Sequence, residues 1–228
     1  MKYSIKYENN DFYMVDKHPN VESFEIADEI NNKNNIERNG LIHRLDKDTS
    51  GLMVIAKNNS ALITIQKLFK DRKVNKSYLG LVWGKLENSG QVELNISRDP
   101  KRKKPMKITQ YSTQLNRGDL RSSKTSWRVK HYYQYKNNYF SLVKFSIFSG
   151  RTHQIRLTAN YLHHPIIGDK IYFFKDSKRM SDGLKLERQF LHSYKIGFKY
   201  KNKLFNFQSD LPADLKIIID KIGPAIEK

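Results

Sequence analysis

Strand-like and helix-like patterns of apolar residues alternate along this chain of 228 residues. Short apolar blocks, and runs in which every second residue is apolar, predict β-strands. These runs cover residues 12–15, 52–56, 78–83, 91–96, 126–133, 139–148, 190–200 and 204–207. Apolar residues at spacings of three and four predict helices over residues 60–69, 152–162 and 212–222. Strands are therefore expected to dominate.

Several predicted strands form pairs joined by short turns. Residues 126–133 and 139–148 flank Lys136-Asn137-Asn138, and residues 190–200 lie just before 204–207, so both pairs predict hairpins. Hairpins give antiparallel strands. The expected fold class is therefore α+β, with a mainly antiparallel mixed sheet flanked by helices and loops.

Three polar stretches interrupt these patterns, at residues 31–35, 97–107 and 175–184. Their Asn, Lys, Pro, Asp and Gly residues are typical of irregular loops. None of them separates two segments that each look able to fold alone. We therefore expect one domain over residues 1–228 with long functional loops.

Basic residues strongly outnumber acidic ones, because 42 Lys and Arg against 23 Asp and Glu give a formal charge of +19. A field of this sign indicates nucleic acid or an anionic membrane as the partner. No run reaches the roughly 18 apolar residues of a spanning helix, and residues 1–6 are too polar for an export signal. Nucleic acid is the better supported partner, and A/T-rich coding is the alternative explanation of the charge.

The chain contains no cysteine, which excludes disulfides, thiolate catalysis and Cys-ligated metals. Its seven histidines show no ligand spacing with an acidic partner. We therefore expect no metal site. The absence of cysteine fits a reducing compartment, so the cytoplasm is the expected location, with an organelle as the alternative.

The most informative stretch is 40–51, where charged residues lie between two apolar blocks. Asp46 stands there between Arg44 and Lys47. A carboxylate at the edge of a core is either half of an ion pair or a reagent, because an ionised carboxylate acts as a nucleophile or a base. Asp48 precedes Thr49-Ser50-Gly51, where its side chain is placed to bond backbone N–H groups, so we interpret it as a turn residue.

Burial opposes the ionisation of Asp46, and a facing cation would restore it. Arg151 is the candidate, because it follows Gly150 between the end of a predicted strand and the start of a predicted helix. A guanidinium clamps a carboxylate with two parallel hydrogen bonds. A purely structural salt bridge is the alternative, and it would be the default for an arbitrary Asp–Arg pair.

Four motifs in order resemble the RluA-type pseudouridine synthases. They are residues 40–51, residues 76–84, residues 150–157 continued by 161–172, and the C-terminal pair 191–192 with 209–215. The resemblance runs from about residue 5 to residue 219, and it implies a pseudouridine synthase catalytic domain without the S4-type RNA-binding domain of many relatives. Residues 16–20 depart from the Lys-Pro-x-Gly that many relatives carry.

The resemblance also implies roles for individual residues. Asp46 is similar to the catalytic aspartate, and Tyr78 to the tyrosine that stacks on the target base and takes a proton from it. Arg151 is similar to the partner of that aspartate. Arg44 is similar to the arginine that enters the space left by a flipped nucleotide. Without the resemblance, Tyr78 would be read as a core residue of a strand.

A basic cluster lies in one of the polar stretches. Its members are Lys101, Arg102, Lys103, Lys104 and Lys107. In the family this region lies near the RNA, so we expect phosphate contacts there, which give affinity without sequence information. A solvated loop is the alternative.

The expected function is isomerisation of specific uridines to pseudouridine in structured RNA, either rRNA, with large-subunit rRNA first, or tRNA. The reaction is redox-neutral, so we expect no cofactor. We also expect no membrane partner and a monomer. A non-catalytic RNA-binding or ribosome-assembly protein on the same fold is the main alternative. A glycosidase or a metal nuclease is a weaker one, because paired or clustered carboxylates are scarce.

Overall fold

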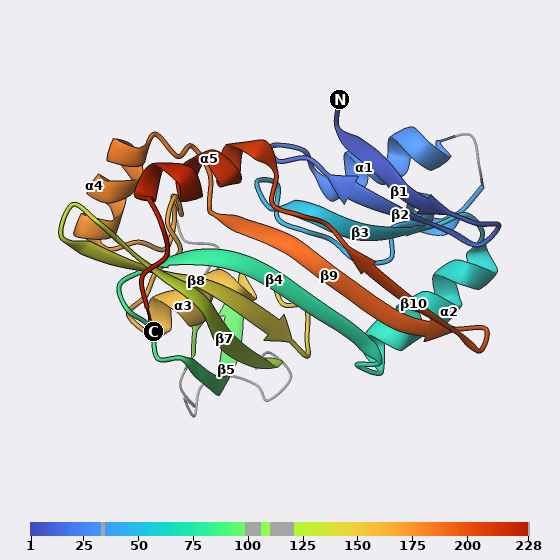
Figure 1. Ribbon diagram of the computed structural model, residues 1–228. Coiled ribbons are helices and arrows are strands. Elements are labelled where there is room, and N and C mark those ends of the chain that lie inside the picture. The colour runs from blue at the N-terminus through green and yellow to red at the C-terminus, as the bar shows by residue number, and fades with distance from the viewer. Residues whose placement is uncertain (33–34, 99–105, 110–120, 228) are drawn as a thin grey trace. The chain divides into compact units, whose positions relative to one another are not determined.

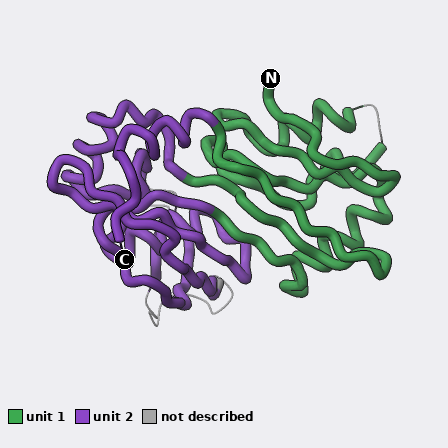
Figure 2. Tube along the Cα trace, viewed as in Figure 1, with its two compact units in different colours: residues 1–78, 191–212 green, residues 79–190, 213–228 purple. Residues whose placement is uncertain are grey.

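The computed structural model describes residues 1–32, 35–98, 106–109 and 121–227, without the side chain of Arg121. The chain divides into two compact units (Figure 2). The first unit comprises residues 1–78 and 191–212, and the second comprises residues 79–190 and 213–228. No helix among the described residues has the length and hydrophobicity that crossing a membrane requires.

The first unit is built on a sheet with the strand order β1-β2-β3-β9, and β10 pairs with β9 (Figure 1). The strands are β1 (Tyr3–Glu8), β2 (Phe12–Lys17), β3 (Ser50–Ala56), β9 (Leu191–Tyr200) and β10 (Lys203–Gln208). The pairings are antiparallel, except for a short parallel contact between β3 and β9. Strand β4 (Val74–Trp83) begins in this unit and ends in the other.

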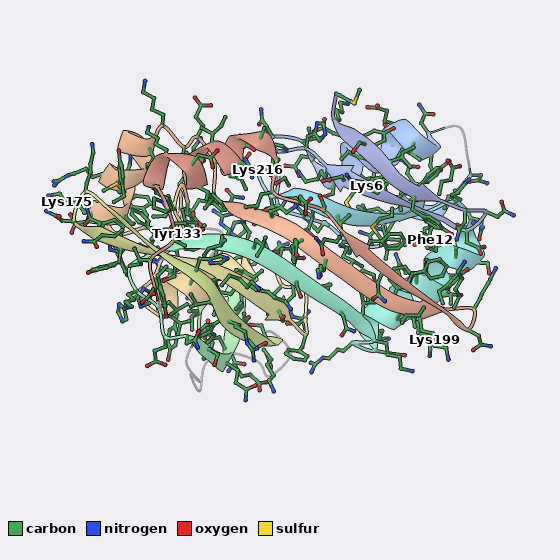
Figure 3. The ribbon with its side chains drawn as sticks, in the orientation of Figure 1. Lys6, Phe12, Tyr133, Lys175, Lys199 and Lys216 are labelled. Carbon is green, nitrogen blue, oxygen red and sulfur yellow. The ribbon has the colours of Figure 1, made fainter. Side chains whose placement is uncertain are left out.

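Helices α1 (Ser23–Asn31) and α2 (Asn59–Lys70) belong to the first unit, with the short 3-10 helix η1 (Glu37–Gly40) between them in sequence. Every residue of β3 is buried, which explains why its sequence is continuously apolar rather than alternating. The core of this unit includes Phe12, Leu62 and Phe198, from β2, α2 and β9. Phe12 lies within this core, whereas Lys6 and Lys199 are exposed (Figure 3).

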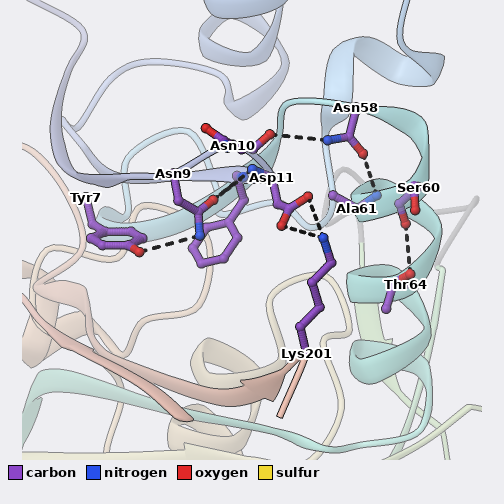
Figure 4. A network of polar contacts seen from close by, with 10 residues as sticks. Tyr7, Asn9, Asn10, Asp11, Asn58, Ser60, Ala61, Thr64 and Lys201 are labelled. Carbon is purple, nitrogen blue, oxygen red and sulfur yellow. Dashed lines mark hydrogen bonds and ion pairs between the residues drawn. The ribbon is translucent and has the colours of Figure 1, made fainter. Parts of the chain in front are cut away.

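Polar side chains fix the turns at one end of the first unit (Figure 4). The Oδ1 of Asn9 accepts hydrogen bonds from the N–H groups of Asp11 and Phe12, at 2.9 and 2.8 Å, and so closes the β1–β2 turn. Asn58 caps α2, because its Oδ1 accepts from the N–H of Ala61 at 2.8 Å. Lys201, in the β9–β10 turn, forms an ion pair of 2.8 Å with Asp11.

The second unit contains an antiparallel sheet with the order β8-β7-β5-β6. Its strands are β5 (Ser89–Arg98), β6 (Met106–Ile108), β7 (Arg121–Tyr135) and β8 (Asn138–Ile147). Its helices are α3 (Gln154–Tyr161), α4 (Lys175–Leu184) and α5 (Ala213–Ile222). Lys136 and Asn137 form the β7–β8 turn with φ of 48° and 59°, the left-handed conformation that tight hairpins require.

The predicted α+β class with a mainly antiparallel mixed sheet is confirmed. Every predicted strand and helix overlaps an observed one, although α3 begins at Gln154, two residues later than predicted. The patterns missed β1, β6, α1 and α4. The predicted loop at 97–107 is wrong at both ends, because residues 97–98 belong to β5 and residues 106–107 to β6. The expectation of one domain over residues 1–228 stays a prediction.

The predicted loop at 175–184 is wrong, because these residues form α4. Its buried face carries Ser177, Ser181 and Leu184, so two of its three buried positions are polar and the apolar stripe of a helix is absent from the sequence. Internal hydrogen bonds satisfy both serines: Ser177 donates to Phe174 O at 2.9 Å, and Ser181 donates to Ser177 O at 2.7 Å.

The predicted loop at 31–35 is wrong at its first residue. Asn31 is the buried last residue of α1, and its amide donates to Asn39 O at 3.0 Å and to Ala56 O at 2.9 Å. Polar sequence alone did not indicate these buried contacts.

Candidate active site

The segment that carries Asp46 connects η1 to β3 and is held on both sides of the carboxylate. On the N-terminal side, the N–H of Leu45 donates to Ser23 Oγ at 2.9 Å, and this hydroxyl donates back to Leu45 O at 3.1 Å. On the C-terminal side, the N–H of Thr49 donates to Asp46 O at 3.0 Å and closes a turn that contains Asp48. Asp46 itself is half-buried. Its position therefore depends on hydrogen bonds of the neighbouring backbone.

Lys17 holds the same segment from β2. Its side chain is fully buried, with an exposed fraction of 0%. Its ammonium donates to three backbone carbonyls: Lys47 O at 2.6 Å, Val21 O at 2.7 Å and His18 O at 2.9 Å. A buried charge is tolerated only when hydrogen bonds replace its water, and here three carbonyls do so. Sequence reasoning noted this stretch as a departure from the family pattern and missed the role of Lys17.

Tyr78 lies on β4 and is buried. Burial raises the pKa of its phenol well above the ordinary value, and the negative charge of Asp46 raises it further, while a hydrogen bond with Ser193 opposes the shift. The phenol therefore keeps its proton at neutral pH and well above it. Both Asp46 and Tyr78 belong to the first unit, and the charge of Asp46 acts on the phenol.

Gly51 allows β9, which carries Ser193, to lie close to β3. It lies at the parallel contact of β3 with β9, opposite Ser193, and has φ of +110°. A Cβ atom at this position would lie 2.4 Å from Ser193 O, so only glycine allows the two strands to approach. Ser193 Oγ donates to Leu52 O at 3.0 Å.

His43, three residues before Asp46, anchors this segment through contacts with α2 and β3. Its ring stacks on Phe69 at 4.5 Å between centroids, and its Nε2 accepts the N–H of Val54 at 3.1 Å. The proton of the neutral ring is therefore on Nδ1. Burial, and to a smaller extent the charge of Lys76, lower the pKa of His43 to about 3. Burial also lowers the pKa of Lys76 to about 8.

Acid is expected to destabilise the first unit through His43. The folded pKa of about 3 lies below the ordinary 6.5, so the stability that neutral His43 contributes is complete above pH 6.5 and is lost as the pH falls toward 3. The free energy of unfolding should fall by up to ~1.4 kcal/mol per pH unit in this window. Urea titrations at several pH values would measure it.

The control is His43→Gln, whose Oε1 can accept the Val54 N–H and does not titrate. This variant should show a shallower loss of stability between pH 6.5 and the acidic end of the same window. The exposed His131→Gln should keep the slope of the unaltered protein. Equal slopes for the unaltered protein and His43→Gln would contradict the assignment.

Arg44 extends away from the core. Its side chain is 67% exposed, and its contact with Glu22 is a loose ion pair of 3.9 Å. An exposed pair of this kind contributes little to stability. Arg44, two residues before Asp46, is therefore accessible to a large partner.

Arg151 belongs to the second unit, between the end of β8 and the start of α3. Its backbone is clamped by Gln154: the N–H of Arg151 donates to Gln154 Oε1 at 3.2 Å, and the N–H of Gln154 donates to Arg151 O at 3.1 Å. The Nε2 of Gln154 donates in turn to Lys124 O and Thr125 Oγ1 on β7, at 3.1 and 3.0 Å. Gln154 thus fixes Arg151 to the sheet. Sequence reasoning missed it, although it lies in the motif.

A buried ion pair anchors α3 itself. Arg156 donates to both carboxylate oxygens of Asp169, at 2.7 and 2.8 Å, and both side chains are almost fully buried. Asp169 Oδ1 also accepts the N–H groups of Ile171 and Tyr172, at 2.8 and 2.9 Å. His153, which precedes α3, lies 3.0 Å from the hydroxyl of Tyr172. The residues before α3 therefore have a rigid support.

The structure brings part of the predicted site together. Asp46, Tyr78 and Arg44 share the first unit, whereas Arg151 lies in the second, so the Asp46–Arg151 pair stays a prediction. Lys107 is exposed on β6. The other members of the basic cluster lie outside the described residues: Lys101, Arg102, Lys103 and Lys104. Within the described part of the chain, no His, Asp and Glu group is arranged to bind a metal.

Solved structures share the fold of this chain. Human RNA Pseudouridylate Synthase Domain Containing 4 has the same fold, with a TM-score of 0.76 at 18% identity over 96% of this chain and 92% of that one. Human RNA Pseudouridylate Synthase Domain Containing 1 gives a TM-score of 0.73 at 25% identity, over 92% of this chain and 84% of that one.

The sequence profile described as RNA pseudouridylate synthase matches residues 11–161. The chain therefore belongs to the RNA pseudouridylate synthase family, and its resemblance to the RluA type is confirmed. An uncharacterized RNA pseudouridine synthase of Aquifex aeolicus is 34% identical over 88% of this chain and 66% of its own length. A ribosomal large subunit pseudouridine synthase D of Borreliella burgdorferi is 35% identical over 80% and 52%. The chain thus spans about half to two thirds of these relatives' length.

Proposed function

We propose that this protein isomerises uridine to pseudouridine in structured RNA, with Asp46 as the catalytic aspartate. The observation that supports this most directly is the half-buried carboxylate of Asp46, which lies near the protonated phenol of Tyr78. Backbone hydrogen bonds to Leu45, Asp46 and Lys47 hold the carboxylate in place. Ribosomal RNA of the large subunit is the first candidate substrate, because relatives in several bacteria are named for it.

The chemistry requires only groups of the chain and the RNA. The target uridine leaves its stack and enters the site, at an unstacking cost of a few kcal/mol that contacts to the protein offset. The bond between C1′ and N1 breaks, the uracil turns, and a bond between C1′ and C5 forms. C5 then loses its proton and N1 gains one, so that atoms and electrons balance without a cofactor.

Each proposed residue has a defined part in this reaction. Asp46 supplies the carboxylate that drives cleavage of the glycosidic bond. Tyr78 stacks on the uracil, and its raised pKa makes it a hydrogen-bond donor rather than the proton acceptor that the family resemblance implied. Arg151 pairs with Asp46 and orients its carboxylate. Arg44 occupies the space that the flipped nucleotide leaves.

Pseudouridine mapping tests the proposal. Total RNA would be incubated with the unaltered protein or with Asp46→Ala, and carbodiimide treatment with primer extension would locate new pseudouridines. New sites with the unaltered protein alone would support the reaction and identify the target. RNA binding without any new pseudouridine would favour the non-catalytic RNA-binding or assembly protein instead.

Arg151→Ala is expected to reduce turnover by ~10²-fold or more, because Asp46 would lose the guanidinium that clamps and orients its carboxylate. Arg151→Lys should recover only part of the activity, since an ammonium lacks the planar fork of a guanidinium. Single-turnover pseudouridine formation would measure both variants, and near-normal turnover in Arg151→Ala would contradict the pairing with Asp46.

A further inference from the structure

One face of the sheet in the second unit is polar and open. The opposite face of β7 packs against α3, where Thr125 contacts Gln154 and Thr158. The open face carries two cations and four neutral polar side chains from three adjacent strands, here called the basic face: Ser89, Gln91, Ser126, Arg128, Lys144 and Ser146. Residues of the basic face alternate with buried ones along β7 and β8, as expected for a half-exposed sheet, and with half-buried ones along β5.

Arg128 and Lys144 lie directly opposite each other on β7 and β8. Like charges at such positions destabilise a sheet, because their Cβ atoms lie only about 5 Å apart. Neither forms an ion pair with a carboxylate in the described part of the chain. The carboxylate on β5, Glu93, lies opposite Lys124, four positions from Arg128 along β7, and accepts a hydrogen bond from Ser122. The folded protein therefore retains a repulsion that an external anion would relieve.

The basic face is also hollowed. A depression of about 490 Å³ is lined by all six of its residues, together with Gly90 and Trp127. Hydroxyl, amide and cationic donors thus converge on a space large enough for a phosphodiester group. Charge-assisted hydrogen bonds of this kind are what a phosphate oxygen accepts best.

The chain continues from the basic face to Arg151 within the same unit. After Ser146, the chain passes through Phe148, which is 45% exposed, and reaches Arg151. The ammonium of Lys124 lies 5.3 Å from the centre of the Phe148 ring. The backbone of Lys124 is bonded by Gln154, the side chain that clamps Arg151. Lys124 and Arg128 are four positions apart on β7, about 13 Å of strand, which is long enough for several consecutive phosphates.

We propose that the basic face binds the phosphodiester backbone of the RNA that flanks the target uridine. This inference rests on the proposed function, because the RNA is the substrate of that reaction. Arg128 and Lys144 bind one phosphate in the depression, and Lys124 with Phe148 extends the track along β7. These contacts supply affinity and orientation and read no sequence.

The double variant Arg128→Gln with Lys144→Gln tests the proposal. Its binding to a fluorescein-labelled RNA hairpin, with a stem of at least one helical turn, would be measured by anisotropy at several salt concentrations. Loss of this phosphate contact should lower affinity by ~10-fold or more and reduce the slope of log affinity against log salt by about 1. The control, Lys199→Gln with Lys203→Gln, removes the same charge from exposed positions of the first unit and should keep the slope.

Lys144→Glu separates binding from folding. The introduced carboxylate would lie opposite Arg128 and form a cross-strand ion pair, so Tm should stay equal or rise while RNA affinity falls. If this variant and the double variant both bind the hairpin with unaltered affinity and salt slope, the basic face is not an RNA surface and the proposal is overturned.

Activity assays distinguish failure of this inference from failure of the proposed function. Rates would be measured over a range of substrate RNA concentrations. The double variant should keep kcat and show a raised KM. If the unaltered protein modifies RNA and the double variant binds normally, the inference about the basic face fails alone. If the unaltered protein modifies no RNA while the double variant loses affinity, the proposed reaction fails and the RNA surface stands.

Discussion

Asp46→Asn is expected to abolish pseudouridine formation, with turnover reduced by at least ~10⁴-fold. An amide has nearly the size of a carboxylate but has no negative charge, so it neither attacks carbon nor accepts a proton under these conditions. Because Asp46 is held through its neighbours' backbone, the exchange should leave the segment in place. RNA binding is expected to remain within about tenfold, and Tm should change little.

The measurement is single-turnover pseudouridine formation, with protein in excess over an RNA identified by mapping. The matched control is Asp48→Asn, two residues away in the turn that Thr49 closes. Asparagine is favoured in turns as aspartate is, so this variant should retain near-normal turnover. Near-normal turnover in Asp46→Asn would refute the role of Asp46, and equal losses in both variants would indicate damage to the turn instead.

Lys17→Met is expected to have the second largest effect, on stability and activity together. Methionine preserves most of the side-chain volume but leaves the carbonyls of His18, Val21 and Lys47 without their donor. A buried polar group that loses its partner costs about 1–3 kcal/mol, and these bonds are partly buried, so the free energy of unfolding should fall by ~2 kcal/mol or more. The segment after Asp46 would also lose its link to β2.

Urea unfolding and turnover, both at a temperature at which the variant is folded, would measure these effects. We expect kcat to fall by ~10-fold or more, because a small displacement of a catalytic group is costly. The control is Lys6→Met on β1, whose ammonium is exposed and lies 3.6 Å from Asp16. This control should change stability by less than about 0.5 kcal/mol. An unchanged free energy of unfolding in Lys17→Met would show that the three hydrogen bonds of Lys17 make no net contribution to stability.

The candidate site was predictable where its residues are neighbours in sequence. The stretch 40–51 contains the carboxylate, its turn and Gly51, and the stretch after Gly150 contains Arg151 and the start of α3. The basic cluster at 101–107 was also evident, although only Lys107 lies among the described residues. Tyr78 depended on the family resemblance, because a tyrosine on an apolar strand has the pattern of a core residue.

Contacts between distant residues were not predictable in this way. Lys17 donates to a carbonyl 30 positions away. Gly51 faces Ser193 at the parallel contact of two strands. Arg128 and Lys144 face each other only because the β7–β8 hairpin has one particular register, with a shift between Val129 and His131. Each of these contacts depends on how elements pair, and apolar periodicity does not report that pairing.

The sequence by itself therefore determined the elements with strong apolar patterns, the turn that carries Asp46 and the basic character of the protein. These features arise from interactions within a few residues, or from composition alone. The tertiary structure decided the burial of Lys17, the protonated state of Tyr78, the clamp of Gln154 on Arg151 and the convergence of cations on the basic face. The physical reason is that burial, charge and hydrogen-bond partners depend on residues that meet only after the chain has folded.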